Sequence, residues 1–261
     1  MIGRRVGRSP RSEPSRDAGP RALTSDFWYT LAYVTAPERR RLEAGRVRIW
    51  ADAMVRAGID RPRALKEVGR LIAAGRAAEA RGSTPPIDAQ AAALSRRLGL
   101  RRPLRGGEIG EALDRNLLRR TVRVAPGAKR ALGRLRRDGI LLGIVSNVLF
   151  ETADGARALL DRLDLRSPFD GLYLSAEHPW AKPRPQPFRM ILRELGAAPD
   201  RSAHIGDLRW DVDGARRAGL TPWLYTGLYR FESPRPAIPR RAGAPLVRIR
   251  RWDEVPAKFG A

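Results

Sequence analysis

The sequence of 261 residues contains no cysteine, which excludes disulfide frameworks, thiolate metal sites and cysteine nucleophiles. It also lacks any apolar run approaching the roughly 18 residues that a helix needs to cross a bilayer. The arginines near its N-terminus are not followed by the apolar stretch of a secretory signal. We therefore expect a cytoplasmic protein without a membrane partner.

Lysine is scarce, because only Lys66, Lys129, Lys182 and Lys258 are lysines, and arginine supplies nearly all of the formal net charge of +23. Such a charge attracts phosphates, nucleic acid or anionic surfaces. An arginine-rich coding bias spread over solvated helix faces would give the same composition. The sequence has neither the interleaved aromatic and basic residues of single-strand binders nor a common nucleic-acid-binding motif. Charge alone therefore names no partner, and the oligomeric state stays open.

The chain divides by composition into three parts. Residues 1–20 contain Arg, Ser, Pro and Gly with almost nothing apolar, which predicts a disordered basic tail. From about 36 to 122, Ala, Leu, Arg and Glu recur at helical spacing, with breaks at residues 58–62, 82–86 and 106–107. This stretch predicts an all-helical module. After it, short apolar segments alternate with helical patterns.

The alternating part predicts a parallel sheet. A helix is expected at 128–137, ended by Gly139. The expected strands, including one before the helical stretch, lie at residues 22–27, 140–145, 172–174, 203–205, 223–225 and 246–249. Strands alternating with helices form parallel sheets covered on both faces. Ligands of such sheets bind outside the carboxyl ends of the strands, so chemistry is expected there.

Polar side chains end the expected strands, and a lysine follows the third. The residues that would converge on this rim are Asp26, Ser146, Asn147, Lys182, Asp207 and Asp211. Clustered carboxylates repel one another unless a cation lies between them. Mg²⁺ prefers one or two carboxylates together with waters and substrate phosphate. A carboxylate that keeps part of its charge can then attack phosphorus.

Four segments, in this order, resemble the motifs of the haloacid dehalogenase-like (HAD) hydrolase superfamily. The first places Asp26 four residues before Thr30, and the second is Val145-Ser146-Asn147. The third is Lys182-Pro183-Arg184-Pro185, and the fourth runs through residues 204–219 with a Gly-Asp pair and a second Asp four residues later. The resemblance covers about 22–32 and 125–226.

The resemblance implies a fold and a domain organisation. The fold would be an α/β three-layer sandwich around a parallel Rossmann-like sheet, with an α-helical cap inserted after the first motif. Residues 21–32 and 125–261 would form the core domain, and residues 33–124 the cap. The implied activity is that of a magnesium-dependent phosphatase, acting on a small phosphorylated metabolite through an aspartyl-phosphate intermediate.

The resemblance also implies the ligands of Mg²⁺. Asp26 would be both the nucleophile and a metal ligand. The backbone carbonyl of Trp28 and the carboxylate of Asp207 would be further ligands. Asp211 would hold a metal-bound water or Lys182.

The other implied roles concern the phosphoryl group. Ser146 and the backbone around Asn147 would hydrogen-bond it, and Lys182 would neutralise the nucleophile and the developing charge. Thr30 belongs to the same catalytic set. From the residues alone, Asp207 and Asp211 also suit helix capping, and His204 suits a buried core position.

Trp28 departs from the family pattern, which usually has a second aspartate at this position as general acid and base. Indole cannot donate a usable proton at neutral pH. Three alternatives follow: a substrate with a good leaving group, such as an acyl or aryl phosphate; a proton donor from the cap or from His178; or different chemistry. Haloacid dehalogenases also lack this aspartate, but they need no metal and typically lack the Gly-Asp that this chain has at Gly206-Asp207.

The alternatives to a phosphatase are therefore a dehalogenase-type hydrolase that uses Asp26 without metal, and a non-catalytic HAD-fold protein that binds nucleic acid. Asp207 favours phosphoryl chemistry over dehalogenation. A pure binding module would have no need of six retained motif residues, which are Asp26, Thr30, Ser146, Lys182, Asp207 and Asp211. Nucleic-acid binding that disappears at moderate salt would also count against this alternative.

Overall fold

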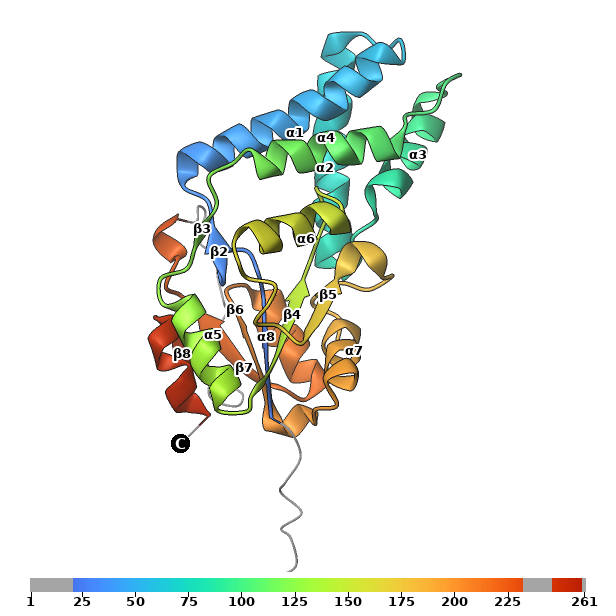
Figure 1. Cartoon of the computed structure of the whole chain (residues 1–261). Helices are drawn as coiled ribbons and strands as arrows, with labels where there is room; N and C mark the ends of the chain where they lie inside the picture. Colours follow the sequence, from blue (N-terminus) through green and yellow to red (C-terminus); the bar gives the residue numbers. More distant parts are fainter. Residues whose placement is uncertain (1–20, 232–245, 260–261) are drawn as a thin grey trace, which may run out of the picture.

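The computed structural model describes residues 21–231 and 246–259 (Figure 1). The predicted disordered tail, residues 1–20, lies outside the described residues. At the centre is a six-stranded sheet in the order β5-β4-β1-β6-β7-β8, and all of its neighbouring strands are parallel. The strands are β1 (Ala22–Ser25), β4 (Leu141–Ser146), β5 (Gly171–Leu174), β6 (Ser202–Gly206), β7 (Thr221–Tyr225) and β8 (Val247–Ile249). The predicted α/β fold with a parallel sheet is confirmed.

Helices cover both faces of the sheet. Side chains point alternately to the two faces along each strand, so each face has its own hydrophobic cluster beneath its helices. Leu23 and Ile144 belong to the cluster beneath α5 (Ala128–Arg137) and α6 (Ala153–Arg162). Their neighbours Ala22 and Val145 belong to the cluster beneath the other two helices. These are α7 (Gln186–Leu195) and α8 (Arg209–Ala218). The result is the three-layer arrangement expected from the sequence.

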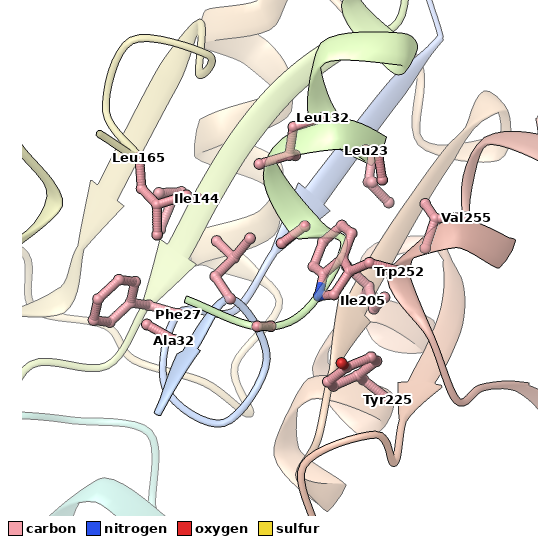
Figure 2. Packing of buried hydrophobic residues seen from close by; sticks show 14 of the residues in the cluster. Leu23, Phe27, Ala32, Leu132, Ile144, Leu165, Ile205, Tyr225, Trp252 and Val255 are labelled. Carbon is pink, nitrogen blue, oxygen red and sulfur yellow. The ribbon is translucent and has the colours of Figure 1, made fainter. Parts of the chain in front are cut away.

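The C-terminal part of the described chain closes one side of the core. Trp252 begins a 3-10 helix (Trp252–Glu254) and is fully buried. Figure 2 shows it among Leu132 of α5, Ile205 of β6 and Tyr225 of β7. Its indole Nε1 donates a hydrogen bond of 2.9 Å to the carbonyl of Thr30, so it also anchors the loop after β1.

Between Tyr33 and Arg123, the chain forms four helices, which we call the four-helix segment: α1 (Ala36–Arg56), α2 (Arg61–Ala80), α3 (Ile87–Leu98) and α4 (Gly106–Leu118). The first two breaks agree with the prediction. The third differs: α3 ends at Leu98, where Gly99 adopts a left-handed conformation with φ of 63°, and Gly106 begins α4 instead of interrupting a helix. A side chain at position 106 would collide with Asp88, and that close packing explains the glycine at the start of the helix.

A pair of short strands was not predicted from the sequence. β2 (Ala32–Tyr33) and β3 (Arg123–Val124) pair antiparallel where the chain leaves and re-enters the sheet region. Each is only two residues long, too short for its alternation to be read from sequence. The four-helix segment begins and ends at this pair and lies beyond the sheet (Figure 1). Among the described residues, no helix has the length and apolar character needed to cross a membrane.

Candidate functional site

The candidate site lies where the order of the strands reverses. β1 is flanked by β4 on one side and β6 on the other, and the chain visits β4 and β5 before it crosses to β6. Such a reversal opens a crevice at the carboxyl ends of the strands. Ser25 is paired with Ile144 and with Ile205, so Asp26 follows directly between the ends of the two neighbouring strands. Its N–H donates to the carbonyl of Ile205 at 2.9 Å.

Lys182 joins two carboxylates at this point. Its Nζ lies 2.5 Å from Asp26 Oδ1 and 2.7 Å from Asp211 Oδ1. Only 1% of the lysine side chain is exposed, and both aspartates are buried. A buried ion pair of this kind requires close contact and further hydrogen bonds to offset the loss of hydration.

Burial and charge set the protonation of these three groups. Burial raises the pKa of Asp26 to about 6, although Lys182 acts in the opposite direction. Burial would lower the pKa of Lys182, but Asp211 and Asp26 reverse this and raise it above its usual value. A pKa of about 6 still lies below 7, and the ion pair with Lys182 favours the carboxylate. At pH 7, Asp26 is therefore ionised beside a charged lysine. Asp26 therefore keeps the negative charge that a nucleophile needs.

Asp211 uses its two oxygens for different partners. Oδ1 lies 3.2 Å from His204 Nε2 as well as close to Lys182, whereas Oδ2 accepts a hydrogen bond of 3.0 Å from the backbone N–H of Leu208 at the start of α8. Burial alone would raise the pKa of Asp211, but Lys182 and His204 outweigh it and lower the pKa to about 2. A side chain at Gly206 would collide with this carboxylate, so the approach requires a glycine there. Asp211 thus caps the helix and also contacts Lys182.

His204 is buried in β6, as expected from the sequence, but its contacts were not predicted. Its Nδ1 lies 2.9 Å from Thr24 Oγ1, and its Nε2 faces Asp211. Burial lowers the pKa of this histidine, which favours the neutral ring. The histidine therefore orients Asp211 from behind.

Three buried carboxylates provide a suitable donor set for a metal. Each of Asp26, Asp207 and Asp211 offers a ligand oxygen, and these atoms all lie within 4.8 Å of one another. Carboxylate oxygens are the hard ligands that Mg²⁺ prefers, so the set fits this ion. Thr30 Oγ1 lies 3.4 Å from Asp207 Oδ1, a long hydrogen bond that holds this carboxylate from the loop after β1.

Asn147 connects the end of β4 to the lysine loop. Its Oδ1 accepts a hydrogen bond of 2.9 Å from the backbone N–H of Lys182, and its Nδ2 donates one of 3.2 Å to the carbonyl of the same residue. The side chain of Asn147 therefore positions Lys182. Ser146 is the last residue of β4 and is buried at the same edge. The structure brings together at this edge the side chains of Asp26, Thr30, Ser146, Asn147, Lys182, Asp207 and Asp211. Trp28 lies two residues after Asp26 in the loop after β1.

Trp28, which stands where the family has its acid, and His178, which was considered as a proton donor, both pack against aromatic rings. The Trp28 ring packs edge-on against Phe27, with the ring centroids 5.0 Å apart. His178 stacks on Tyr173 with the centroids 4.3 Å apart. The face of the His178 imidazole is therefore engaged in packing against Tyr173.

Two further carboxylates near the site were missed. Glu79, in the last turn of α2, accepts a hydrogen bond of 3.3 Å from Asn147 Nδ2. Glu151, which follows β4, pairs with Arg46 of α1 at 3.0 Å. One signal for Glu79 was available in the sequence, because a carboxylate at the C-terminus of a helix opposes the helix dipole and needs a special reason to be there.

Comparison with known proteins agrees with this geometry. The sequence model of the haloacid dehalogenase-like hydrolase family matches residues 22–219. A phosphoserine phosphatase from Thermus thermophilus is 36% identical over 143 residues, which are 54% of this chain and 55% of that protein. The chain therefore matches about half the length of this relative.

Solved structures share the fold at low identity. A HAD phosphatase from Thermococcus onnurineus superposes with a TM-score of 0.61 at 20% identity, over 92% of this chain and 98% of that chain. A 2-haloacid dehalogenase from Pseudomonas syringae pv. Tomato DC3000 superposes with a TM-score of 0.62 at 21% identity, over the same shares of the two chains. Fold similarity therefore does not distinguish the two chemistries. The family match covers most of the chain and includes every strand end that contributes to the site, and the protein belongs to the haloacid dehalogenase-like hydrolase family.

Proposed function

We propose that the protein is a magnesium-dependent phosphatase that acts on a small phosphorylated metabolite through an aspartyl-phosphate on Asp26. The observation that carries this proposal is the buried set of Asp26, Asp207 and Asp211 around Lys182. Three clustered carboxylates and a single lysine leave a net negative charge, which a divalent cation would neutralise.

In this proposal, Asp26, Asp207 and the backbone carbonyl of Trp28 hold the ion, and Asp211 supports it through water or Lys182. When bound, Mg²⁺ would supply positive charge to the nucleophile and to the phosphoryl oxygens. Thr30 would orient Asp207 through the contact described above. The role of Thr30 is therefore positioning, because it touches a metal ligand instead of the substrate.

The protein groups would act by positioning and charge. The Asp26 carboxylate attacks phosphorus, and Lys182 neutralises the nucleophile and the charge that develops. The hydroxyl of Ser146 and the backbone N–H groups around Asn147 donate to the phosphoryl oxygens. The side-chain amide of Asn147 is already engaged with the Lys182 backbone, so we assign only its backbone to the phosphoryl group.

We further propose that residues 33–124 form a cap domain over a core of residues 21–32 and 125–261. Support comes from contacts that join the segment to loops at the carboxyl ends of the strands. Thr84 Oγ1 donates to Ser175 Oγ at 2.6 Å, and the N–H of Ala181 donates to the carbonyl of Gly82 at 2.9 Å. A segment held over the site in this way would exclude water and select the substrate.

Two observations favour phosphatase chemistry over the dehalogenase alternative. Asp207 belongs to the carboxylate cluster, and a metal-free halide displacement has no use for a third buried carboxylate beside the nucleophile. In addition, the curated relative described above is a phosphatase at 36% identity. Phosphoserine is the substrate named for that relative, and it serves here as a first probe of the substrate class.

Phosphate release from p-nitrophenyl phosphate and acetyl phosphate, with and without Mg²⁺, tests the proposal. Wild type, Asp26→Asn and the control Asp213→Asn would be compared, because Asp213 lies on α8 and pairs with Arg209 at 3.0 Å outside the cluster. Magnesium-dependent turnover that only Asp26→Asn abolishes is expected. Absence of turnover by wild type would contradict a phosphatase. Chloride release from 2-chloropropionate would then support the dehalogenase alternative. Binding of nucleic acid at moderate salt, without any turnover, would support the non-catalytic alternative.

A further inference from the structure

Glu79 reaches the candidate site from the four-helix segment. It lies in the last turn of α2, and Asn147 Nδ2 donates to its Oε1 at 3.3 Å. The same Nδ2 donates to the carbonyl of Lys182, whose ammonium contacts Asp26. Glu79 is therefore separated from the proposed nucleophile by two residues in direct contact with each other.

The position of Glu79 suits the departing group of a phosphoryl transfer. The attacking and leaving oxygens lie on opposite sides of phosphorus in such a reaction. Asp26 would attack from the sheet, so the leaving oxygen would point away from the sheet toward the four-helix segment (Figure 1). A proton donor for that oxygen must therefore come from the side on which Glu79 is found.

Of Glu79 and Glu151, Glu79 is the carboxylate that suits proton transfer. Glu151 is ion-paired with Arg46 at 3.0 Å and so holds α1 against the loop after β4. Glu79 instead has the neutral amide of Asn147 as its hydrogen-bond partner.

The environment of Glu79 favours its protonated form. Burial raises its pKa, against the smaller effects of the Asn147 hydrogen bond and the Lys182 and Arg76 charges; Glu151 acts in the same direction as burial. The carbonyl dipoles at the C-terminus of α2 also disfavour a negative charge there. Asn147, Lys182, Arg76 and Glu151 are the polar and charged groups that set this balance.

We infer that Glu79 is the general acid and base of this protein, and that it supplies from the four-helix segment the function that Trp28 cannot supply. The inference rests on the proposed phosphatase function. Glu79 would be a catalytic residue, because its carboxyl group would touch the leaving oxygen and later the attacking water.

The proton balance of the reaction is complete with this residue. As Asp26 Oδ forms a bond to phosphorus, the bond from phosphorus to the ester oxygen breaks, and that oxygen takes the proton of the Glu79 carboxyl group to leave as an alcohol. Water then occupies the vacated side and attacks phosphorus, while the Glu79 carboxylate takes one of its protons. The bond between phosphorus and Asp26 breaks, which regenerates the Asp26 carboxylate, inorganic phosphate and a protonated Glu79.

The test compares a poor leaving group with a good one. Steady-state kcat and KM would be measured in Mg²⁺ for O-phosphoserine, an alkyl phosphate, and for p-nitrophenyl phosphate, whose leaving group needs little protonation. Glu79→Gln keeps the shape and the hydrogen bond to Asn147 but removes the acid. Because proton transfer typically contributes about 10²–10⁴-fold, kcat on O-phosphoserine is expected to fall at least about 100-fold. The loss on p-nitrophenyl phosphate is expected to be below about tenfold, since that leaving group needs little protonation.

Two comparisons separate a chemical role from a structural one. Glu151→Gln removes the carboxylate that pairs with Arg46, and it is expected to change kcat on both substrates by the same factor. The wild-type pH profile for O-phosphoserine should fall at high pH as Glu79 ionises, and Glu79→Gln should lack that fall. If Glu79→Gln does not fold, Glu79→Asp, which keeps the acid but withdraws it by one methylene, should show the same dependence on the leaving group.

The outcomes distinguish a failure of the role of Glu79 from a failure of the proposed phosphatase function. Equal losses on both substrates in an active protein would overturn the role of Glu79 and leave the phosphatase intact. Wild-type turnover of p-nitrophenyl phosphate without turnover of any alkyl phosphate would also overturn it, because a working acid hydrolyses both. Absence of turnover on every phosphate would overturn the phosphatase and the role of Glu79 together.

Discussion

Lys182 Nζ lies 2.7 Å from Asp211 Oδ1 in a site where both side chains are only 1% exposed. The lysine completes its contacts with Asp26 at 2.5 Å, so that one ammonium group is shared by two buried carboxylates. Removing it would leave two negative charges inside the fold, and breaking such a pair costs more than the pair itself contributes. This relationship makes Lys182 important for stability as well as for the proposed chemistry.

Lys182→Met is therefore expected to lower the free energy of unfolding by about 3–5 kcal/mol when no divalent cation is present. Urea denaturation at pH 8 in EDTA measures the change. Lys129→Met is the matched control, because Lys129 is 49% exposed and pairs with Asp164 at 3.2 Å on the surface. Its loss is expected to be below about 1 kcal/mol. Equal losses for the two variants would contradict the importance of the buried pair.

Magnesium is expected to stabilise the folded protein through the carboxylate cluster. A ligand that binds only the native state at about 100 times its Kd adds about 2.7 kcal/mol, so Tm should rise with Mg²⁺ concentration. Asp207→Asn should remove this rise, because it takes away one of the three clustered carboxylates. Asp213→Asn should retain it. A rise of the same size in Asp207→Asn would show that Mg²⁺ acts elsewhere.

Thr30 should affect the metal through Asp207. Its Oγ1 lies 3.4 Å from Asp207 Oδ1, and the loss of such a supporting contact typically weakens metal binding about 10–100-fold. Because the contact is long, Thr30→Val is expected at the lower end, with about a tenfold higher Mg²⁺ concentration at half of the maximal thermal shift. An unchanged midpoint would show that Thr30 does not orient Asp207.

Glu79 should make stability depend on pH. Burial raises its pKa in the folded state, so the proton is held more tightly there than in the unfolded chain. The stability that this binding contributes is present below the unfolded pKa and is lost as the pH rises through the folded pKa. Glu79→Gln cannot lose a proton, so its Tm relative to wild type should increase from pH 4 to pH 8. A constant difference in Tm over this range would contradict the raised pKa.

The sheet and its strand ends were predictable because their signals are local. The run from Ile140 to Val145 is apolar throughout, as a strand buried on both faces must be, and β4 forms there. The position of Asp26 at the end of the first strand follows from the same pattern, and parallel strands bring their carboxyl ends to one edge. The prediction that Asp26, Lys182, Asp207 and Asp211 meet was therefore available without coordinates, as was the family resemblance.

Other features depend on contacts between distant residues, which local sequence patterns do not show. The short strands β2 and β3 pair residues about 90 positions apart, and neither has enough length to show alternation. His204 was expected in the core, but its contacts with Thr24 and Asp211 depend on the register of β6 beside β1. Glu79 had one local signal, its place in the last turn of α2, but its approach to Asn147 depends on how α2 packs against the core.

The sequence by itself determined the α/β class, the alternation of strands and helices that predicts a parallel sheet, and the residues at the strand ends. These features are readable because periodicity and strand ends are properties of neighbouring residues. Only the tertiary structure decided which further groups contact those residues. It placed His204 behind Asp211 and brought Glu79 to Asn147. The physical reason is that burial and charge act through space: the protonation of each group depends on what packs around it, whatever its distance along the chain.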